Sequence, residues 1–261
     1  MTVGVGARIL LLDAHCVVVN KLPGEAVEGA RAGIASLPEM LAEEIALRAG
    51  VPSAHDALAK PEAAHRLDVP VSGCALFARS SGALRLFNQA FSQGEIEKRY
   101  WAIVEAAGLE AQARGFVEKL QGAARQPVEI AHWLRFDSRS NKSFAQDEPG
   151  AALKKAVMRC AFVGTGRDYL FLEIELVTGR HHQIRAQLAR LGLKIKGDLK
   201  YGARRSEKNG GIRLHARGLS FADPSGTLKR GAQERVTVKA EAPADALWLA
   251  FEDCASRRAY S

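Results

Sequence analysis

A carboxylate beside a guanidinium marks the stretch of this chain that is best suited to chemistry. The stretch reads His65-Arg66-Leu67-Asp68, is followed by Ser72-Gly73, and lies just before an apolar run at 74–78. A carboxylate in such a polar interruption can cap a turn, pair with an arginine, or act as a nucleophile. The other functional groups of the chain must decide which of these three roles Asp68 has.

The basic residues of the chain are concentrated in one segment. The chain has 261 residues and a formal net charge of +8. Residues 180–217 contain eleven lysines and arginines but only two acids, and this surplus of nine exceeds the net charge of the whole chain. Such a segment fits a polyanion, most simply nucleic acid, although a solvated protein face can have the same composition.

Length and composition restrict the class of protein. An apolar content of 47% with 25% charged residues is ordinary for a globular protein, and the chain is long enough to bury a core without stabilising disulfides or metals. No apolar run approaches the roughly 20 residues of a membrane helix, and Asp13 and His15 break the N-terminal apolar run, so we expect no signal peptide. Four scattered cysteines without a CxxC spacing predict neither a zinc site nor a redox pair, and they favour the reducing cytoplasm.

The order of expected elements predicts the fold class. Helices are expected at 36–50, 80–94, 182–191 and 244–255, and strands at 7–12, 16–20, 73–78, 100–105, 127–136, 155–163, 169–177, 212–221 and 235–240. This strand-rich order without regular βαβ units indicates the α+β class, with a mixed, mainly antiparallel central sheet and flanking helices. We expect flexible insertions at 108–125 and 137–150, and a single catalytic domain over 1–261.

Five stretches, taken together and in this order, resemble the RluA-type pseudouridine synthase family. They are the 65–73 stretch; Lys98-Arg99-Tyr100; 178–185; Gly197-Asp198 with Tyr201-Gly202; and Arg213-Leu214-His215-Ala216 through Phe221 and Pro224. The segment 17–24 looks like the opening strand and turn of that family, and the resemblance covers about residues 9–243. It implies the pseudouridine synthase catalytic fold. It also implies isomerisation of uridine to pseudouridine in structured RNA, ribosomal or transfer RNA, without cofactor or metal.

The resemblance also implies roles for four residues. Asp68 matches the catalytic aspartate, which attacks ribose C1′ or base C6, or promotes a glycal intermediate. Arg185 would pair with Asp68 and keep it ionised, unless it contacts phosphate instead. Tyr100 would offer its ring to the displaced base and its hydroxyl to proton transfer, or else pack within a strand. Arg66 would fill the space left by a flipped-out uridine, or pair with a nearby acid.

Further substrate contacts and three departures from the family pattern complete the resemblance. The implied contacts with RNA come from His65, Arg180, His182, Gln183 and Ile184. Val71 and His181 stand where the family commonly has threonine, and Gln187 stands where it usually has histidine, which puts substrate contacts and loop hydrogen bonding in question. We expect no appended N-terminal RNA-binding module of the kind that many relatives carry, and we therefore expect the catalytic domain or a partner to hold the RNA.

Two other classes of function compete with this interpretation. A non-catalytic RNA-binding protein on the same fold would use the basic segment 180–217 alone. A hydrolase built on His65, Asp68 and Ser72 is disfavoured, because triad members normally come from distant segments and no Gly-x-Ser-x-Gly elbow is present. His181 and His182 are adjacent and lack a third ligand, so we expect no metal site. We expect a monomer without membrane contact.

Overall fold

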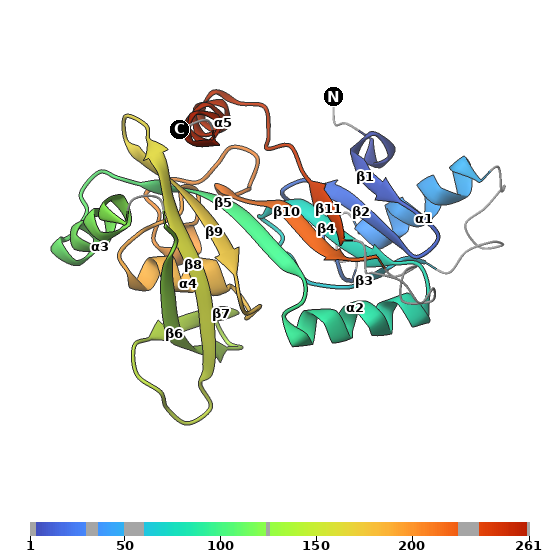
Figure 1. The fold of residues 1–261 in the computed structure, drawn as a ribbon, viewed down its shortest axis with the longest axis horizontal. Coiled ribbons are helices and arrows are strands. Elements are labelled where there is room, and N and C mark those ends of the chain that lie inside the picture. Colours follow the sequence, from blue (N-terminus) through green and yellow to red (C-terminus); the bar gives the residue numbers. More distant parts are fainter. Residues whose placement is uncertain (1–3, 30–35, 50–59, 124–125, 224–234, 260–261) are drawn as a thin grey trace. The chain divides into compact units, whose positions relative to one another are not determined.

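The computed structural model describes residues 4–29, 36–49, 60–123, 126–223 and 235–259 (Figure 1). The chain divides into a first unit, Met1–Lys98 with Ala216–Glu241, and a second unit, Arg99–His215 with Ala242–Ser261. The single catalytic domain expected over 1–261 stays a prediction. The expected helix end at Gly50 and the motif residue Pro224 lie outside the described residues.

The first unit is built on antiparallel strands. β1 pairs with β2, β2 and β3 pair with β4, and β10 pairs with β11, each in antiparallel register. The 3-10 turn η1 (Val5–Arg8) precedes β1 and takes up the first two residues of the strand expected at 7–12. The strands are β1 (Ile9–Leu12), β2 (Cys16–Lys21), β3 (Glu62–Ala63), β4 (Ser72–Ala78), β10 (Leu214–Ala222) and β11 (Arg235–Lys239).

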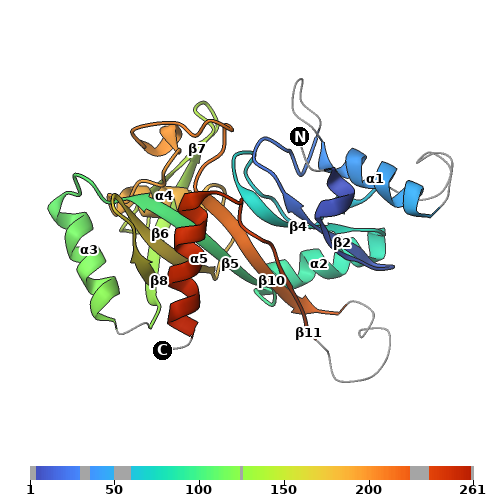
Figure 2. The ribbon, with the colours of Figure 1, turned by 90° about the horizontal axis from the view of Figure 1, so that it is seen from above.

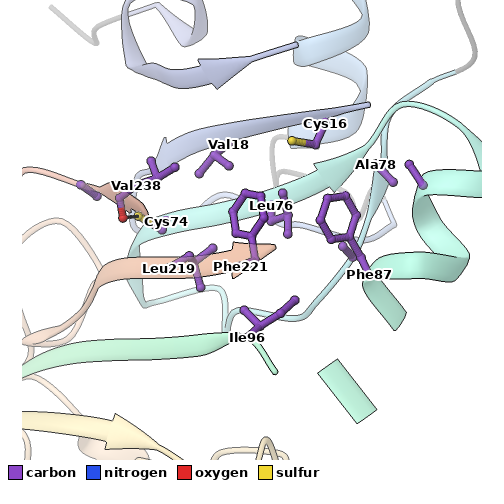
Figure 3. Close-up of a cluster of buried hydrophobic side chains, with 13 residues drawn as sticks. Cys16, Val18, Cys74, Leu76, Ala78, Phe87, Ile96, Leu219, Phe221 and Val238 are labelled. Atoms are coloured by element: carbon purple, nitrogen blue, oxygen red, sulfur yellow. Dashed lines mark hydrogen bonds between the residues drawn. The ribbon is translucent and has the colours of Figure 1, made fainter. Parts of the chain in front are cut away.

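The first unit also contains two helices, α1 (Leu37–Arg48) and α2 (Ser81–Gln93). Helix α2 begins where the Ser80 hydroxyl accepts a hydrogen bond from the Ala83 amide, and it ends at Gly94 in the left-handed conformation. Its Phe87 meets Phe221 of β10 edge to face at 5.6 Å, within the apolar core of the unit (Figure 3). The apolar spacing of α2 thus places this helix on the sheet.

The strands of the second unit are also antiparallel. They follow the order β5-β9-β8-β6-β7, so β7 lies at the edge. This arrangement, together with the first unit, confirms the α+β class and the mainly antiparallel sheet predicted from the sequence. The strands are β5 (Glu97–Glu105), β6 (Val128–Asp137), β7 (Lys142–Gln146), β8 (Lys154–Thr165) and β9 (Tyr169–Leu176).

Helices of the second unit pack against these strands. Helix α5 (Ala246–Ala259) contacts β8 (Figure 2). Its Phe251 ring stacks on Trp101 of β5 with the ring centres 4.5 Å apart. Helix α4 (Gln183–Arg190) packs against β6 and β7, where Ala186 joins Leu134 in a small apolar cluster. A 3-10 turn, η2 (Leu199–Tyr201), contacts α4.

Two sequence expectations are wrong. The segment 108–125 was expected to be a flexible insertion, but it contains helix α3 (Ala111–Gly122), which buries Ala113, Val117 and Leu120. The segment 137–150 was also expected to be flexible, but it contains β7, which pairs with β6 as a hairpin. In both segments, a few buried side chains stabilise regular structure that the polar and glycine-containing sequence conceals.

Candidate active-site residues

A tight turn in the first unit carries Asp68. The Asp68 carbonyl accepts a hydrogen bond from the Val71 amide at 3.0 Å, which closes the turn immediately before β4. Gly73 follows with a φ of 110°, and a Cβ added there would lie 2.3 Å from the Ala216 carbonyl oxygen. Only glycine allows β4 this close approach to the backbone of β10. Gly73 of the Ser-Gly pair is therefore needed for backbone packing beside the turn.

A buried lysine holds the Asp68 turn. Lys21, at the end of β2, is fully buried, and its Nζ donates to the carbonyls of Leu22 at 3.0 Å, Val69 at 2.9 Å and Val71 at 2.6 Å. Burial lowers the pKa of Lys21 to about 7, against the attraction of Glu25 and Asp68, which raises it. Lys21 thus fixes the backbone of the turn that carries Asp68.

A second buried ion pair supports the segment that carries Lys21. Arg8 donates to both carboxylate oxygens of Glu25, at 2.9 Å and 2.7 Å, and Glu25 also accepts from the Leu22 amide at 2.8 Å. Two parallel bonds of this kind fix orientation as well as distance. The turn after β2 is therefore rigid where Lys21 reaches the Asp68 turn.

The two residues before Leu67 have different surroundings. His65 accepts a hydrogen bond from the Leu76 amide at Nε2, and its ring stacks on Phe91 at 5.1 Å. Burial, with a smaller effect of Lys98, lowers the pKa of His65 to about 4. His65 therefore serves as a neutral acceptor within the fold, which further disfavours a hydrolase triad, and its predicted contact with substrate stays a prediction.

Arg66 is placed at the surface. Its side chain is 74% exposed, and its Nε lies 3.7 Å from the exposed Glu28 carboxylate. An exposed pair at this distance contributes little to stability, so the guanidinium can exchange this partner for RNA at low cost. The sequence alternative of a local ion pair is therefore present, and it is compatible with the predicted role in base flipping.

Helix α4 of the second unit carries a buried arginine. Arg185 is 5% exposed and donates from Nε at 2.7 Å and from Nη2 at 2.8 Å to the two carboxylate oxygens of Asp198. Its guanidinium also lies over the Tyr201 ring at 5.0 Å. Asp68 belongs to the first unit, so the predicted Asp68–Arg185 pair stays a prediction.

The sequence placed only one side of α4 in the interior, but the described helix is buried more widely. Ile184 and Leu188 are buried as expected, and so are the polar residues Gln183, Arg185 and Gln187. The Gln187 amide donates to the carbonyls of Ile130 and Ala156, which places this departure from the family pattern in the core. Gln187 therefore joins α4 to the sheet.

The turn that leads into α4 is organised by Gln183. Its Oε1 accepts from the Thr178 hydroxyl at 2.8 Å and from the Arg180 amide at 2.9 Å, and its Nε2 donates to the Val157 carbonyl. Arg180 is exposed beside this turn, with its Nε bonded to the Lys155 carbonyl. Gln183 thus shapes the turn. Arg180 is exposed to solvent, and its predicted contact with phosphate stays a prediction.

Aromatic contacts and hydrogen bonds of His181, His182 and Tyr201 connect α4 to the β6–β7 hairpin. His182 adopts a left-handed φ of 50°, and its Nδ1 lies 3.1 Å from the Tyr201 hydroxyl. That hydroxyl donates to the Ser143 carbonyl of β7, and the Ser143 hydroxyl lies 3.0 Å from Nδ1 of His181. His181 and His182 stack at 3.8 Å. The two histidines therefore link helix and hairpin.

Tyr100 lies in β5 opposite Ile174 of β9 and is 6% exposed. It shares a strand face with Ala102 and Val104, both fully buried, so the packing role weighed from the sequence is compatible with its position. Its predicted part in catalysis stays a prediction.

Sequence reasoning missed the functions of three residues. Lys21 was noted only as part of an opening turn, and Asp198 and Tyr201 only as members of a motif. A lysine next to the apolar run of β2 was the available signal for Lys21, because a charge inside a buried strand needs partners. The structure brings together His65, Arg66 and Asp68 in the first unit. It brings together Arg180, His182, Gln183, Ile184 and Arg185 in the second.

Comparison with known protein families identifies the chain. The model of the family described as RNA pseudouridylate synthase matches residues 15–190, most of the chain. The chain therefore belongs to this family, in its RluA type, and is an RNA pseudouridine synthase, an isomerase that acts on RNA.

Individual relatives agree with this assignment. An uncharacterised RNA pseudouridine synthase of Zymomonas mobilis is 32% identical over 90% of this chain and 93% of its own length. tRNA pseudouridine synthase C of Haemophilus ducreyi is 33% identical over 64% of this chain and 68% of its own. The dual-specificity RNA pseudouridine synthase RluA of Pasteurella multocida is 30% identical over 62% of this chain and 68% of its own length.

A solved structure supports the fold. Human RNA pseudouridylate synthase domain containing 4 aligns with a TM-score of 0.66 at 20% identity, over 97% of this chain and 94% of the human chain. In the described part of the chain, no helix combines the length and apolar character that a membrane crossing requires.

Proposed function

We propose that this pseudouridine synthase uses Asp68 as its nucleophile. The observation that carries the proposal is the turn of Asp68, which the buried ammonium of Lys21 fixes through the carbonyls of Val69 and Val71. A carboxylate acts as a nucleophile only when it is ionised and oriented. The hydrogen bonds of Lys21 fix the turn, and the fixed turn supplies the orientation.

The chemistry assigned to Asp68 balances without an added reactant. The N1–C1′ bond of uridine breaks, the base turns, and a C5–C1′ bond forms. The hydrogen on C5 leaves as a proton, and N1 gains one. The carboxylate attacks C1′ or C6, or promotes a glycal intermediate, and it is regenerated when the carbon–carbon bond has formed.

The remaining predicted residues have supporting roles in this proposal. Tyr100 contacts the displaced base and exchanges a proton with it, and Arg185 keeps Asp68 ionised. Arg66 is exposed, and it fills the space of the flipped uridine, which offsets part of the few kcal/mol that flipping costs. Substrate contacts are assigned to His65, Arg180, His182, Gln183 and Ile184.

The proposed substrate is structured RNA, transfer or ribosomal, in the cytoplasm. Relatives named tRNA pseudouridine synthase C and dual-specificity RNA pseudouridine synthase support this class of target. The basic segment 180–217 would bind the phosphates, so affinity should fall steeply as salt rises.

Tritium release tests this proposal. RNA labelled with tritium at C5 of uridine should release tritium to water when incubated with the purified protein, and Asp68→Asn should bind the same RNA but release none. Mapping pseudouridines in wild-type and deletion strains would then identify the uridine. If the purified protein binds RNA from a deletion strain but releases no tritium from it, the result would instead favour the non-catalytic alternative.

A further inference from the structure

The β6–β7 hairpin presents two exposed aromatic rings. Seven large apolar side chains are exposed within the described ranges, and the two aromatic ones, Phe136 at 53% and Phe144 at 38%, both lie in this hairpin. A ring left exposed forgoes the stabilisation that burial of its apolar surface would give. Two rings left exposed on one short hairpin therefore point to a partner that covers them.

The strand register places the two rings on opposite faces of the hairpin. Phe144 lies opposite Arg135, and Phe136 lies opposite Ser143. Residues directly opposite one another in an antiparallel pair share a face, and neighbours along a strand alternate. The hairpin thus offers one ring on each side, close to its turn at 138–141.

Positive charges lie beside the Phe144 ring and at the turn of the hairpin. The Arg135 guanidinium lies 5.7 Å and the Lys142 ammonium 5.2 Å from the centre of the Phe144 ring. The Lys200 ammonium donates to the carbonyls of Ser140 and Asn141 in the turn. Aromatic faces with adjacent cations suit single-stranded nucleic acid, because bases stack on the rings and phosphates bind the cations. An apolar protein surface would not match these charges.

The Phe136 ring is held in place. It meets His181 edge to face at 4.6 Å, and His181 is itself stacked on His182 and bonded to the Ser143 hydroxyl. His181 stands where the family commonly has threonine, so this chain has a ring at the position that supports Phe136. A ring fixed before binding loses less conformational entropy when a base stacks on it.

We propose that the β6–β7 hairpin docks unpaired nucleotides of the RNA substrate. Bases stack on Phe136 and Phe144, and the flanking phosphates bind Arg135, Lys142 and Lys200. This inference rests on the proposed function, since it assigns a contact of the same RNA, but it concerns residues outside the catalytic motifs.

The test measures binding of two RNA probes. The first is a single-stranded oligouridylate of about 12 nucleotides, within the range that stacking sites cover, and the second is a duplex of the same length. Phe136→Leu and Phe144→Leu should each weaken single-strand binding about five- to hundredfold and leave duplex binding nearly unchanged. Lys142→Gln and Lys200→Gln should weaken the binding of both probes and make that binding less dependent on salt concentration.

Matched variants separate stacking from loss of apolar surface or of the fold. Phe136→Trp and Phe144→Trp should retain wild-type affinity, because they keep a ring. Leu249→Ala removes an equally exposed apolar side chain on α5 and should change nothing. Wild-type affinity in the leucine variants, or equal losses for both probes, would overturn the inference. A wild-type protein that binds RNA through these rings but forms no pseudouridine would contradict only the proposed function.

Discussion

Two buried cations organise the functional residues, one in each unit, and their surroundings differ. The Lys21 ammonium is enclosed by three backbone carbonyls, those of Leu22, Val69 and Val71. The Arg185 guanidinium instead forms two bonds to the carboxylate of Asp198. Backbone carbonyls therefore bond the first cation, which Glu25 and Asp68 also attract, whereas a carboxylate bonds the second cation directly.

This difference shows what each cation can do for catalysis. Arg185 stays charged at any pH relevant to proteins, and its bond to Asp198 orients the start of α4. The Nζ of Lys21 donates to backbone carbonyls, and burial lowers the pKa of Lys21 to about 7 while Glu25 and Asp68 raise it. Its charge therefore acts on Asp68 across space, and its hydrogen bonds act on the turn.

Breaking the Arg185 pair should have the largest effect on stability. Asp198→Asn keeps the shape of the side chain but removes the negative charge that accepts two hydrogen bonds from the buried guanidinium, which should lower the free energy of unfolding by about 3–5 kcal/mol in urea denaturation. The control is Asp147→Asn, which removes an exposed partner of Arg190 and should cost less than about 1 kcal/mol. Equal losses of unfolding free energy in the two variants would contradict a stabilising role for the buried Arg185–Asp198 pair.

Replacing the other cation should affect activity more than stability. Lys21→Met fills the same space without donors, so the Asp68 turn loses its bonds and the rate of pseudouridine formation should fall about a hundredfold. Its loss of unfolding free energy should be smaller than that of Asp198→Asn, because a buried charge is also removed. Lys60→Met, at an exposed lysine, is the control. A wild-type rate in Lys21→Met would show that Lys21 does not position Asp68.

The lowered pKa of Lys21 predicts how stability depends on pH. Between pH about 7 and 10.5 the unfolded chain keeps a proton on Lys21 that the folded chain releases, so stability rises with pH in this window. Wild type should gain about 2 kcal/mol relative to Lys21→Met between pH 7 and pH 9. Urea denaturation of both proteins across this range measures the difference, and parallel curves would contradict the burial of a titrating ammonium.

The smallest effect is expected in the turn before α4. Thr178→Val removes the hydroxyl that donates to Gln183 and accepts from the Val157 amide, which should cost about 1 kcal/mol of unfolding free energy. Thr237→Val changes an exposed threonine of β11 and should have little effect. If the two variants melt alike, Gln183 does not depend on Thr178 for its position.

Much of the fold could be predicted from local patterns. Ser80 and Gly94 bound α2 as the sequence indicated, because their cap geometries depend on residues that are close in the chain. The Asp68 turn lies where a polar interruption meets a buried strand. Such features need only neighbouring residues to form.

Features that depend on distant residues could not be predicted. Lys21 is buried because carbonyls about 50 residues away accept its hydrogen bonds, as the Val69 and Val71 contacts show. The short polar strand β7 exists because it pairs with β6 and because Tyr201, 58 residues from Ser143, bonds to it. Neither partner is visible in the local sequence.

The most direct test of the central claim is a single-turnover measurement on Asp68→Asn. Asp68 is half-buried in its turn, so the variant should keep the urea denaturation midpoint and the RNA affinity of wild type. Wild type should convert its bound uridine and release tritium from C5, while Asp68→Asn should release none above background. Release by Asp68→Asn at the wild-type rate would contradict the role of this carboxylate as the nucleophile.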